Sequence, residues 1–265
     1  MKPDSPDELS MNAKASSFPD HFSGVAGGYA SYRPRYAPAL FAALAEVAPA
    51  TDVVWDCACG TGQASVSLAK HFARVVATDA SAEQIAHAEA HSGVEYRVAP
   101  AEASGLADAS VSLVTVAQAL HWFDVDAFHR EVQRVLAPGG IIAEWSYALL
   151  TVPEAPAIAD AVNAMDARLR AWWPPQRQHV DERYARLSFP FARIAFGEFG
   201  MSARWSPAQL IGYVATWSAV SRFRAAQHTD PIPAFAAEVE QAWGSAATRD
   251  VHWPLTVRVG RMTAR

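Results

Sequence analysis

Residues 53–63 have the sequence Val-Val-Trp-Asp-Cys-Ala-Cys-Gly-Thr-Gly-Gln, and this stretch decides the fold of the chain. Val53 to Trp55 are strand-forming apolar residues, Asp56 ends the run, and a loop of small residues leads into a helix that is expected over 64–72. Gly60 and Gly62 let the backbone turn tightly and approach a ligand closely. The stretch is therefore predicted to be a strand, a ligand-binding loop and a helix start.

The sequence around this stretch alternates between short apolar runs and helical patterns. Further strands are predicted at 75–77, 94–98, 111–116 and 141–145, the last of them after a turn at 138–140. Helices are predicted between several of these strands. One of them begins at Ser81-Ala82-Glu83-Gln84, which has the form of a capping box, and is expected to reach about Ala90. Strands that alternate with helices predict an α/β fold with a doubly wound, mostly parallel sheet and helices on both faces. The predicted helices are 38–47, 64–72, 81–90 and 125–136.

Composition excludes several classes of protein. Of the 265 residues, 51% are hydrophobic and only 18% are charged, which excludes a disordered chain. The net charge of −5 lacks the basic excess of a protein held by nucleic-acid phosphates. The longest apolar stretch, 111–123, is interrupted by polar residues and is too short to span a membrane. Without an apolar leader and with only Cys57 and Cys59 as thiols, the chain is predicted to be cytoplasmic.

A carboxylate follows the second strand as well as the first. Asp79 lies 23 residues after Asp56, where a side chain accepts hydrogen bonds from both hydroxyls of an unphosphorylated ribose. The alternative is an ordinary strand–helix turn without a ligand. A nicotinamide dinucleotide is a second possible ligand, but its Gly-x-Gly-x-x-Gly fingerprint fails here because Gln63 or Ser65 stands at the third glycine.

Five segments together resemble one enzyme family. Asp56–Gly62 looks like motif I of the class I S-adenosylmethionine-dependent methyltransferases, except that Ala58 replaces the usual first glycine. Gln118–Phe123 and Arg134–Gly140 resemble motifs of the methyltransferase type 11 group. Tyr29–Tyr36 resembles a segment of proteins related to trans-aconitate methyltransferases, as does 213–218. The resemblance implies a Rossmann-like sheet of seven strands whose last strand is antiparallel.

The resemblance also implies roles for individual residues. The loop after Asp56 would hold the methionine part of S-adenosylmethionine, and Asp79 would hold its ribose. Glu102 would read the adenine, although a plain surface carboxylate is an equal alternative, and Gln118 would line the sulfonium end. The predicted cofactor-binding residues are Tyr29, Arg33, Asp56, Ala58, Gly60, Gly62, Asp79, Ala80, Ala101, Glu102 and Gln118.

The predicted chemistry is an in-line displacement in which a methyl group moves from the sulfonium to an oxygen of a small molecule, either a carboxylate or a hydroxyl. A carboxylate needs no base, whereas a hydroxyl does, and His121 is the candidate for that catalytic role. No metal is predicted. His87 and His91 are four apart on the expected helix but lack a third ligand, and the two cysteines are interpreted as small loop residues.

The chain is predicted to have three parts. Residues 1–20 are expected to form a mobile arm, 21–150 the S-adenosylmethionine-binding core, and 151–265 a set of acceptor-covering helices with the last strands of the sheet. Six of the nine tryptophans lie after Tyr147, which favours an at least partly apolar small-molecule acceptor. The alternatives are an NAD-dependent oxidoreductase and a non-catalytic cofactor-binding regulator. A monomer or a homodimer is expected, without a nucleic-acid or membrane partner.

Overall fold

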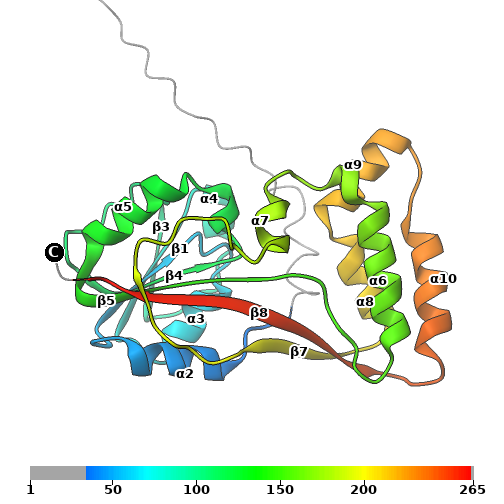
Figure 1. The fold of residues 1–265 in the computed structure, drawn as a ribbon, viewed down its shortest axis with the longest axis horizontal. Coiled ribbons are helices and arrows are strands. Elements are labelled where there is room, and N and C mark those ends of the chain that lie inside the picture. Colours follow the sequence, from blue (N-terminus) through cyan, green and yellow to red (C-terminus); the bar gives the residue numbers. More distant parts are fainter. Residues whose placement is uncertain (1–33, 264–265) are drawn as a thin grey trace, which may run out of the picture.

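The computed structural model describes residues 34–263, and a single sheet runs through them (Figure 1). The predicted arm 1–20 and the predicted ligands Tyr29 and Arg33 lie outside the described residues. The strand order is β3-β2-β1-β4-β5-β8-β6, with β7 also paired to β8. The first five strands are parallel to their neighbours, and β8 is antiparallel to β5, so the α/β fold class is confirmed. The strands are β1 (Val53–Cys57), β2 (Arg74–Asp79), β3 (Val94–Val98), β4 (Val111–Ala117), β5 (Leu136–Tyr147), β6 (Ala192–Arg193), β7 (Gly200–Trp205) and β8 (Arg249–Arg261).

Helices cover both faces of the parallel strands, as the buried runs of those strands require. One face packs against α2 and α3 through Leu40, Phe41 and Leu68, and the other packs against α5 through Phe128 and Val132. All five of these side chains are fully buried. The helices of this part are α2 (Pro38–Val47), α3 (Gln63–Leu68), α4 (Ala82–Ala86), the 3₁₀ helix η1 (Leu120–Trp122) and α5 (Val125–Val135).

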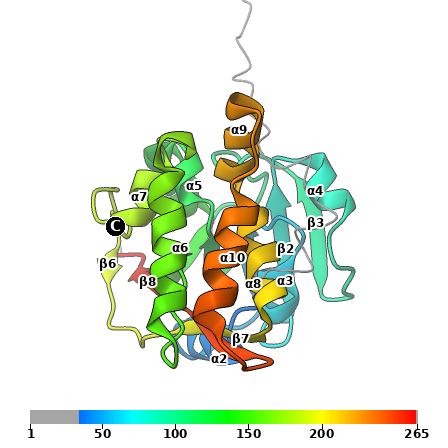
Figure 2. The same ribbon diagram turned by 90° about the vertical axis from the view of Figure 1, so that its right-hand side faces the viewer.

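The remaining helices form a separate group beside the sheet. In Figure 1, β7 and β8 extend from the sheet toward this group, and Figure 2 shows α6 and α10 side by side. Its buried residues, among them Val162, Phe235 and Trp253, form an apolar cluster of their own. The group contains α6 (Pro156–Arg168), η2 (Arg170–Trp172), α8 (Pro207–Ala215), α9 (Ser218–Gln227) and α10 (Ile232–Trp243), while α7 (Arg177–Asp181) packs on η1.

The predicted seven strands become eight. The expected edge strand next to β8 is divided into β6 and β7, which pair with opposite ends of β8. The register shifts by one residue between the two, because the chain leaves β8 between Ile194 and Phe199. β8 begins at Arg249, and β7 supplies a partner for its first six residues.

Two other predicted boundaries are wrong for local reasons. The helix expected to reach Ala90 ends at Ala86, because Glu89 N donates to Thr61 O (3.0 Å) and so directs the chain toward the glycine loop. The turn at 138–140 is a bulge inside β5, where Leu136 pairs with Val111 and Ile141 with Leu113. Among the helices of residues 34–263, none has the length and apolar character needed to cross a membrane.

Candidate functional site

Asp56 is a buried carboxylic acid beneath the glycine loop. Its Oδ2 accepts a hydrogen bond from Ser65 Oγ (2.6 Å) and its Oδ1 accepts one from Thr115 Oγ1 (2.8 Å). Only 1% of the residue is exposed, and desolvation raises the pKa of Asp56 to about 6 despite these two donors. The side chain therefore joins β1, α3 and β4 under the loop and fixes where the loop begins.

The loop itself uses left-handed backbone at three positions. Ala58 has φ 52°, Gly60 has φ 55° and Gly62 has φ 86°. A Cβ atom on Gly62 would lie 2.1 Å from Tyr96 Oη, so glycine is required there for space as well as for conformation. At Ala58, where the family pattern has glycine, the left-handed backbone costs about 1 kcal/mol. The loop keeps its shape although one of its glycines is replaced.

Asp79 connects the end of β2 to the glycine loop. Its Oδ2 accepts from Gly60 N and its Oδ1 accepts from Ser81 N, each at 2.9 Å. A carboxylate oxygen has two lone pairs, so these bonds leave acceptor capacity for ribose hydroxyls. Ala80 follows and is exposed, and the Ser81 side chain accepts from Gln84 N as a helix cap. The structure thus brings Asp79, Ala80 and Gly60 together.

The predicted adenine residues follow β3. Ala101 is 8% exposed and packs with the apolar cluster that includes Cys57 and Leu120. Glu102 is half-buried, and its Oε1 accepts from Asp124 N (3.1 Å) near the start of α5. Glu102 therefore already has a structural partner, which keeps the alternative role of a structural carboxylate open.

Gln118 follows β4 in a strained backbone conformation. Its φ is 56°, which is rare for a residue other than glycine and is typical of functional sites. Its N donates to Trp145 O (2.9 Å), and its side-chain Nε2 donates to Tyr147 O (3.0 Å). These bonds tie the carboxyl ends of β4 and β5 together beside the glycine loop of β1.

His121 is the middle residue of η1, three positions after Gln118. Its Nδ1 lies 3.2 Å from Tyr184 Oη, and its ring packs on Trp122 with centroids 4.9 Å apart. Burial lowers the pKa of His121 to about 4, helped by the nearby charges of Arg177 and His179 on α7. The imidazole is consequently neutral at physiological pH.

The start of the described chain is fastened to the same region. Gln63 Nε2 donates to Pro34 O (3.1 Å), and Arg35 Nη2 bonds to Glu89 Oε2 (3.2 Å). The segment that continues from the predicted ligands Tyr29 and Arg33 therefore runs beside the glycine loop.

Two residues near the site were missed by the reasoning from sequence. Tyr96 fills the space over Gly62 and donates to Glu89 O (2.8 Å), and Tyr184 contacts His121. Neither stands in a motif. Tyr96 stands in a strand whose mixed polar and apolar residues do not mark it as a site residue. Tyr184 lies in a turn that is far from His121 in the sequence.

No evidence for a metal centre emerges from residues 34–263, which hold no group of three or more His, Cys, Asp or Glu side chains suited to a metal ion. His87 and His91 are not on one helix, because α4 ends at Ala86. Burial raises the pKa of Cys57, the last residue of β1, and of Cys59 in the loop, so both stay protonated thiols.

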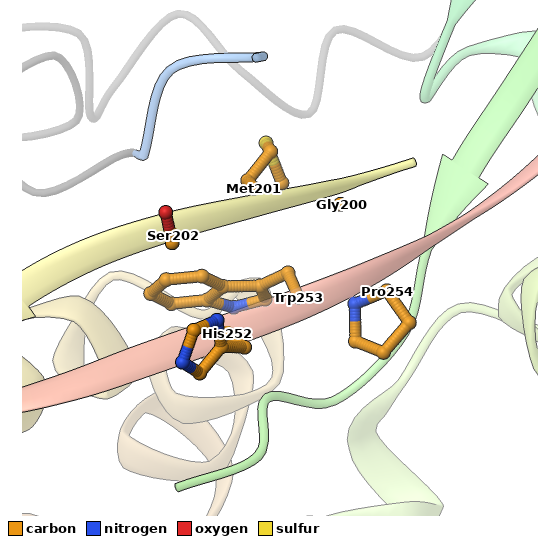
Figure 3. A pocket seen from close by; sticks show the side chains of 6 residues that line it. All are labelled: Gly200, Met201, Ser202, His252, Trp253 and Pro254. Carbon is orange, nitrogen blue, oxygen red and sulfur yellow. The ribbon is translucent and has the colours of Figure 1, made fainter. Parts of the chain in front are cut away.

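A surface pocket of about 270 Å³ lies between β7 and β8 (Figure 3). Gly200, Met201 and Ser202 line it from one strand, and His252, Trp253 and Pro254 line it from the other. None of the predicted cofactor residues belongs to this lining. The pocket is therefore distinct from the arrangement at the carboxyl ends of the parallel strands.

Comparison with known proteins gives a consistent result. Residues 55–143 match the family described as "Methyltransferase domain". A protein of Dictyostelium discoideum named as a methyltransferase is 30% identical over 254 residues, which cover 90% of this chain and 93% of the relative. A protein of Saccharomyces cerevisiae named as S-adenosylmethionine-dependent is 29% identical over 100 residues, covering 35% of this chain and 34% of that one.

A solved structure from Anaeromyxobacter dehalogenans, named as a type II methyltransferase, is similar over most of the chain. It is 42% identical and has a TM-score of 0.83, with 88% of this chain and 100% of the other covered. The similarity therefore extends beyond the glycine loop and includes the helical group after β5.

Proposed function

Because this chain belongs to the class I S-adenosylmethionine-dependent methyltransferases, we propose that it methylates an oxygen of a small molecule, with a carboxylate oxygen favoured. S-adenosylmethionine is the cofactor. The predicted binding residues fit it: Gly60 leaves room for a close approach, and the Asp79 carboxylate lies at the end of β2, where it accepts from Gly60 N and Ser81 N. The proposal concerns the acceptor, the accepting atom and the residues that hold each partner.

The protonation of His121 carries the preference for a carboxylate. A general base works best when its pKa is near the working pH, whereas that of His121 is lowered to about 4. Such a histidine stays neutral and serves as a hydrogen-bond partner but takes up a proton weakly. A carboxylate acceptor is already ionised, so its oxygen attacks without giving up a proton. The low pKa of His121 therefore matches an acid better than an alcohol.

The residues act mainly by orienting the reactants. Bound S-adenosylmethionine supplies a methyl group on a positively charged sulfur, which is the reactive bond of the transfer. In the predicted roles, Asp79 and the glycine loop fix the cofactor, Gln118 lines its sulfonium end, and His121 borders the acceptor. Holding the acceptor oxygen in line with the methyl–sulfur bond converts binding into rate.

A hydroxyl acceptor is the second candidate, with His121 as its base. Nε2 of His121 has no hydrogen-bond partner among residues 34–263, which leaves that atom available to the proton of a hydroxyl acceptor.

The family membership argues against the two other functions considered for the sequence, an NAD-dependent oxidoreductase and a regulator without activity. The relation to trans-aconitate methyltransferases remains a prediction from sequence.

An acceptor screen with methyl-labelled S-adenosylmethionine tests the proposal. The panel pairs each carboxylic acid with the alcohol of the same carbon skeleton, and methyl esters are recognised because mild alkali releases their label as methanol. We expect turnover with acids and much less with the paired alcohols. Transfer to alcohols that rises with pH and is lost in His121→Gln would support the hydroxyl alternative, and transfer only to carbon or nitrogen would contradict both.

We also propose the wider context predicted from the sequence. The acidic chain is expected to be cytoplasmic, to act as a monomer or homodimer and to have no nucleic-acid partner. Residues 21–150 would form the cofactor-binding core, and the helices after 151 would cover the acceptor. Light scattering and a filter-binding assay with tRNA and duplex DNA test the oligomer and the nucleic-acid predictions.

A further inference from the structure

A buried ionic cluster lies below the site and has no part in the predicted cofactor set. Glu144 on β5 is fully buried, and its two oxygens contact His129 Nε2 (2.6 Å) and Arg258 Nε. His129 is 2% exposed and Arg258 is 6% exposed. Burying such a group costs more free energy than it commonly returns, and a well-packed apolar cluster would often be at least as stable. A role other than stability therefore has to be considered.

Arg258 uses its remaining donors to hold one turn of the chain. Its Nη1 donates to Tyr184 O (2.9 Å) and Leu187 O (3.2 Å), and its Nη2 donates to Ser188 O (3.3 Å). The guanidinium also lies against the Tyr184 ring, 5.6 Å from its centroid. We name residues 183–188 the clamp turn, since one buried side chain bonds to three of its carbonyls.

The clamp turn is strained and needs such support. Arg183 has φ 54° and Tyr184 has φ 57°, so two consecutive residues other than glycine adopt the left-handed conformation. This conformation costs roughly 1–2 kcal/mol for each residue. Tyr184 N donates to His179 O (2.7 Å), which continues the turn directly from α7. The three carbonyl bonds from Arg258 offset the strain and fix the path of the backbone.

The backbone path of the clamp turn determines where the Tyr184 side chain lies. Tyr184 is 1% exposed, and its Oη lies 3.2 Å from His121 Nδ1 and next to the Ser146 side chain. The other groups that face His121 are Arg177 and His179 of α7, which packs on η1. A hydrogen bond at one ring nitrogen determines which tautomer a neutral histidine adopts. It therefore also determines whether the other nitrogen donates or accepts a hydrogen bond.

We propose that Arg258, held by Glu144, is a positioning residue for the acceptor side of the site. It fixes the clamp turn so that the Tyr184 hydroxyl keeps His121 in one ring orientation and one neutral tautomer, leaving Nε2 of defined character for the acceptor. The inference rests on the proposed function in one respect, which is that His121 borders the acceptor. The positional statement itself concerns only Arg258, Tyr184 and His121.

Imidazole NMR of the full chain, labelled with ¹⁵N at histidine and assigned with His121→Gln, tests this inference. Arg258→Met removes the clamp at similar side-chain length. Arg261→Met is the matched control, since Arg261 on the same strand donates to Gly139 O (2.7 Å) and Val47 O (3.0 Å), away from the clamp turn. We expect one His121 tautomer and no titration between pH 5.5 and 8 in the parent protein and in Arg261→Met. Arg258→Met should show mixed tautomers.

Tyr184→Phe should reproduce the mixed tautomers directly, because it removes the hydroxyl and retains the ring. If Arg258→Met does not fold, Arg258→Lys takes its place, since lysine keeps the charge beside Glu144 but its three donors cannot serve Glu144 and three carbonyls at once. An unchanged His121 spectrum in the folded Arg258 variant, or an equal change in Arg261→Met, would overturn the inference. S-adenosylhomocysteine affinity serves as the check on folding. None of these measurements depends on turnover, so a wrong acceptor assignment would be distinguishable.

Discussion

The parallel-strand half and the C-terminal helical group treat buried polar atoms differently. Trp55 on β1 and Trp253 on β8 are both fully buried, yet Trp55 Nε1 donates to Thr78 Oγ1 (2.9 Å) whereas Trp253 Nε1 has no acceptor within residues 34–263. The buried indole nitrogens of Trp172 and Trp173 likewise have no acceptor there, whereas Trp243 Nε1 in the helical group donates to Ala246 O (3.0 Å) and Trp145 Nε1 on β5 has no acceptor among these residues. The parallel-strand half also buries a carboxyl group bonded by two side chains, Asp56 with Ser65 and Thr115, while the cluster around α10 is built from apolar and aromatic side chains.

This difference suits two kinds of ligand. A cofactor that is the same in every turnover benefits from a loop fixed by carboxylates and backbone donors, such as the bonds of Asp79 to Gly60 and Ser81. Packing of aromatic rings, such as that of Trp205 on Trp253 with centroids 4.8 Å apart, imposes fewer directional requirements. If the helical group covers the acceptor, as proposed, acceptor specificity can change there without disturbing the glycine loop.

The largest expected effect is on stability, from Phe235→Ala in the helical group. Phe235 is fully buried in the cluster around α10, and removing such a ring costs about 3–5 kcal/mol of unfolding free energy. We expect S-adenosylhomocysteine affinity of the folded variant to stay within about twofold, measured by calorimetry beside urea unfolding. Phe41→Ala is the matched loss in the sheet half. A tenfold weaker affinity in folded Phe235→Ala would break the comparison.

Asp56→Asn is expected to change how stability depends on pH. The folded pKa of Asp56 is raised to about 6, so its stabilising contribution is present below the unfolded pKa and is lost as pH rises through about 6. The difference between the variant and the parent protein should therefore grow by up to about 3 kcal/mol from pH 3.5 to 7, in favour of the variant.

Asp52→Asn is the control of opposite sign for this prediction. A hydrogen bond from Ser112 lowers the pKa of Asp52, so its contribution is present above the unfolded pKa and is lost as pH falls. Urea unfolding between pH 3.5 and 7.5 compares the two variants. If the unfolding free energies of Asp56→Asn and the parent protein change with pH in parallel, ionisation of the Asp56 carboxyl group does not destabilise the folded protein.

Asp79→Ala tests the cofactor half directly. The substitution removes the acceptor of Gly60 N and Ser81 N as well as the predicted ribose contact. We expect S-adenosylhomocysteine to bind at least tenfold more weakly, a loss of about 1.4 kcal/mol, in titration calorimetry. Asp108→Ala removes an exposed carboxylate paired with Arg134 and should leave the affinity unchanged. An equal affinity in both variants would exclude Asp79 from the binding site.

The smallest expected effect is that of Ala58→Gly, which restores the family pattern in the loop. Relief of the left-handed strain at φ 52° is nearly offset by the greater freedom of glycine in the unfolded chain. We expect a change in unfolding free energy of less than about 0.5 kcal/mol. Ala69→Gly, at φ −62°, has no strain to relieve and should cost about 0.5–1 kcal/mol. Equal losses in both variants would indicate that Ala58 is unstrained.

Much of the fold was predictable because its signals are local. The strands at 53–57, 94–98 and 111–117 stand where runs of apolar residues and turns indicated them. The helices α3, α4 and α5 connect successive parallel strands, except that residues 99–110 join β3 to β4 without a helix. Boundaries that depend on distant contacts were not predictable. The early end of α4 results from a bond between Glu89 and Thr61, and the first half of β8 pairs with β7.

The sequence by itself determined the glycine loop. The order of Asp56, Gly60, Gly62 and Asp79 identified both the family and the edge of the sheet where these residues meet, because parallel strands bring their carboxyl ends together. Only the tertiary structure decided the surroundings of His121. Its neutral state arises from burial against α7, and its contact with Tyr184 depends on Arg258 and Glu144, which lie on other strands. Burial and long-range hydrogen bonds are properties of the packed chain, so no local pattern encodes them.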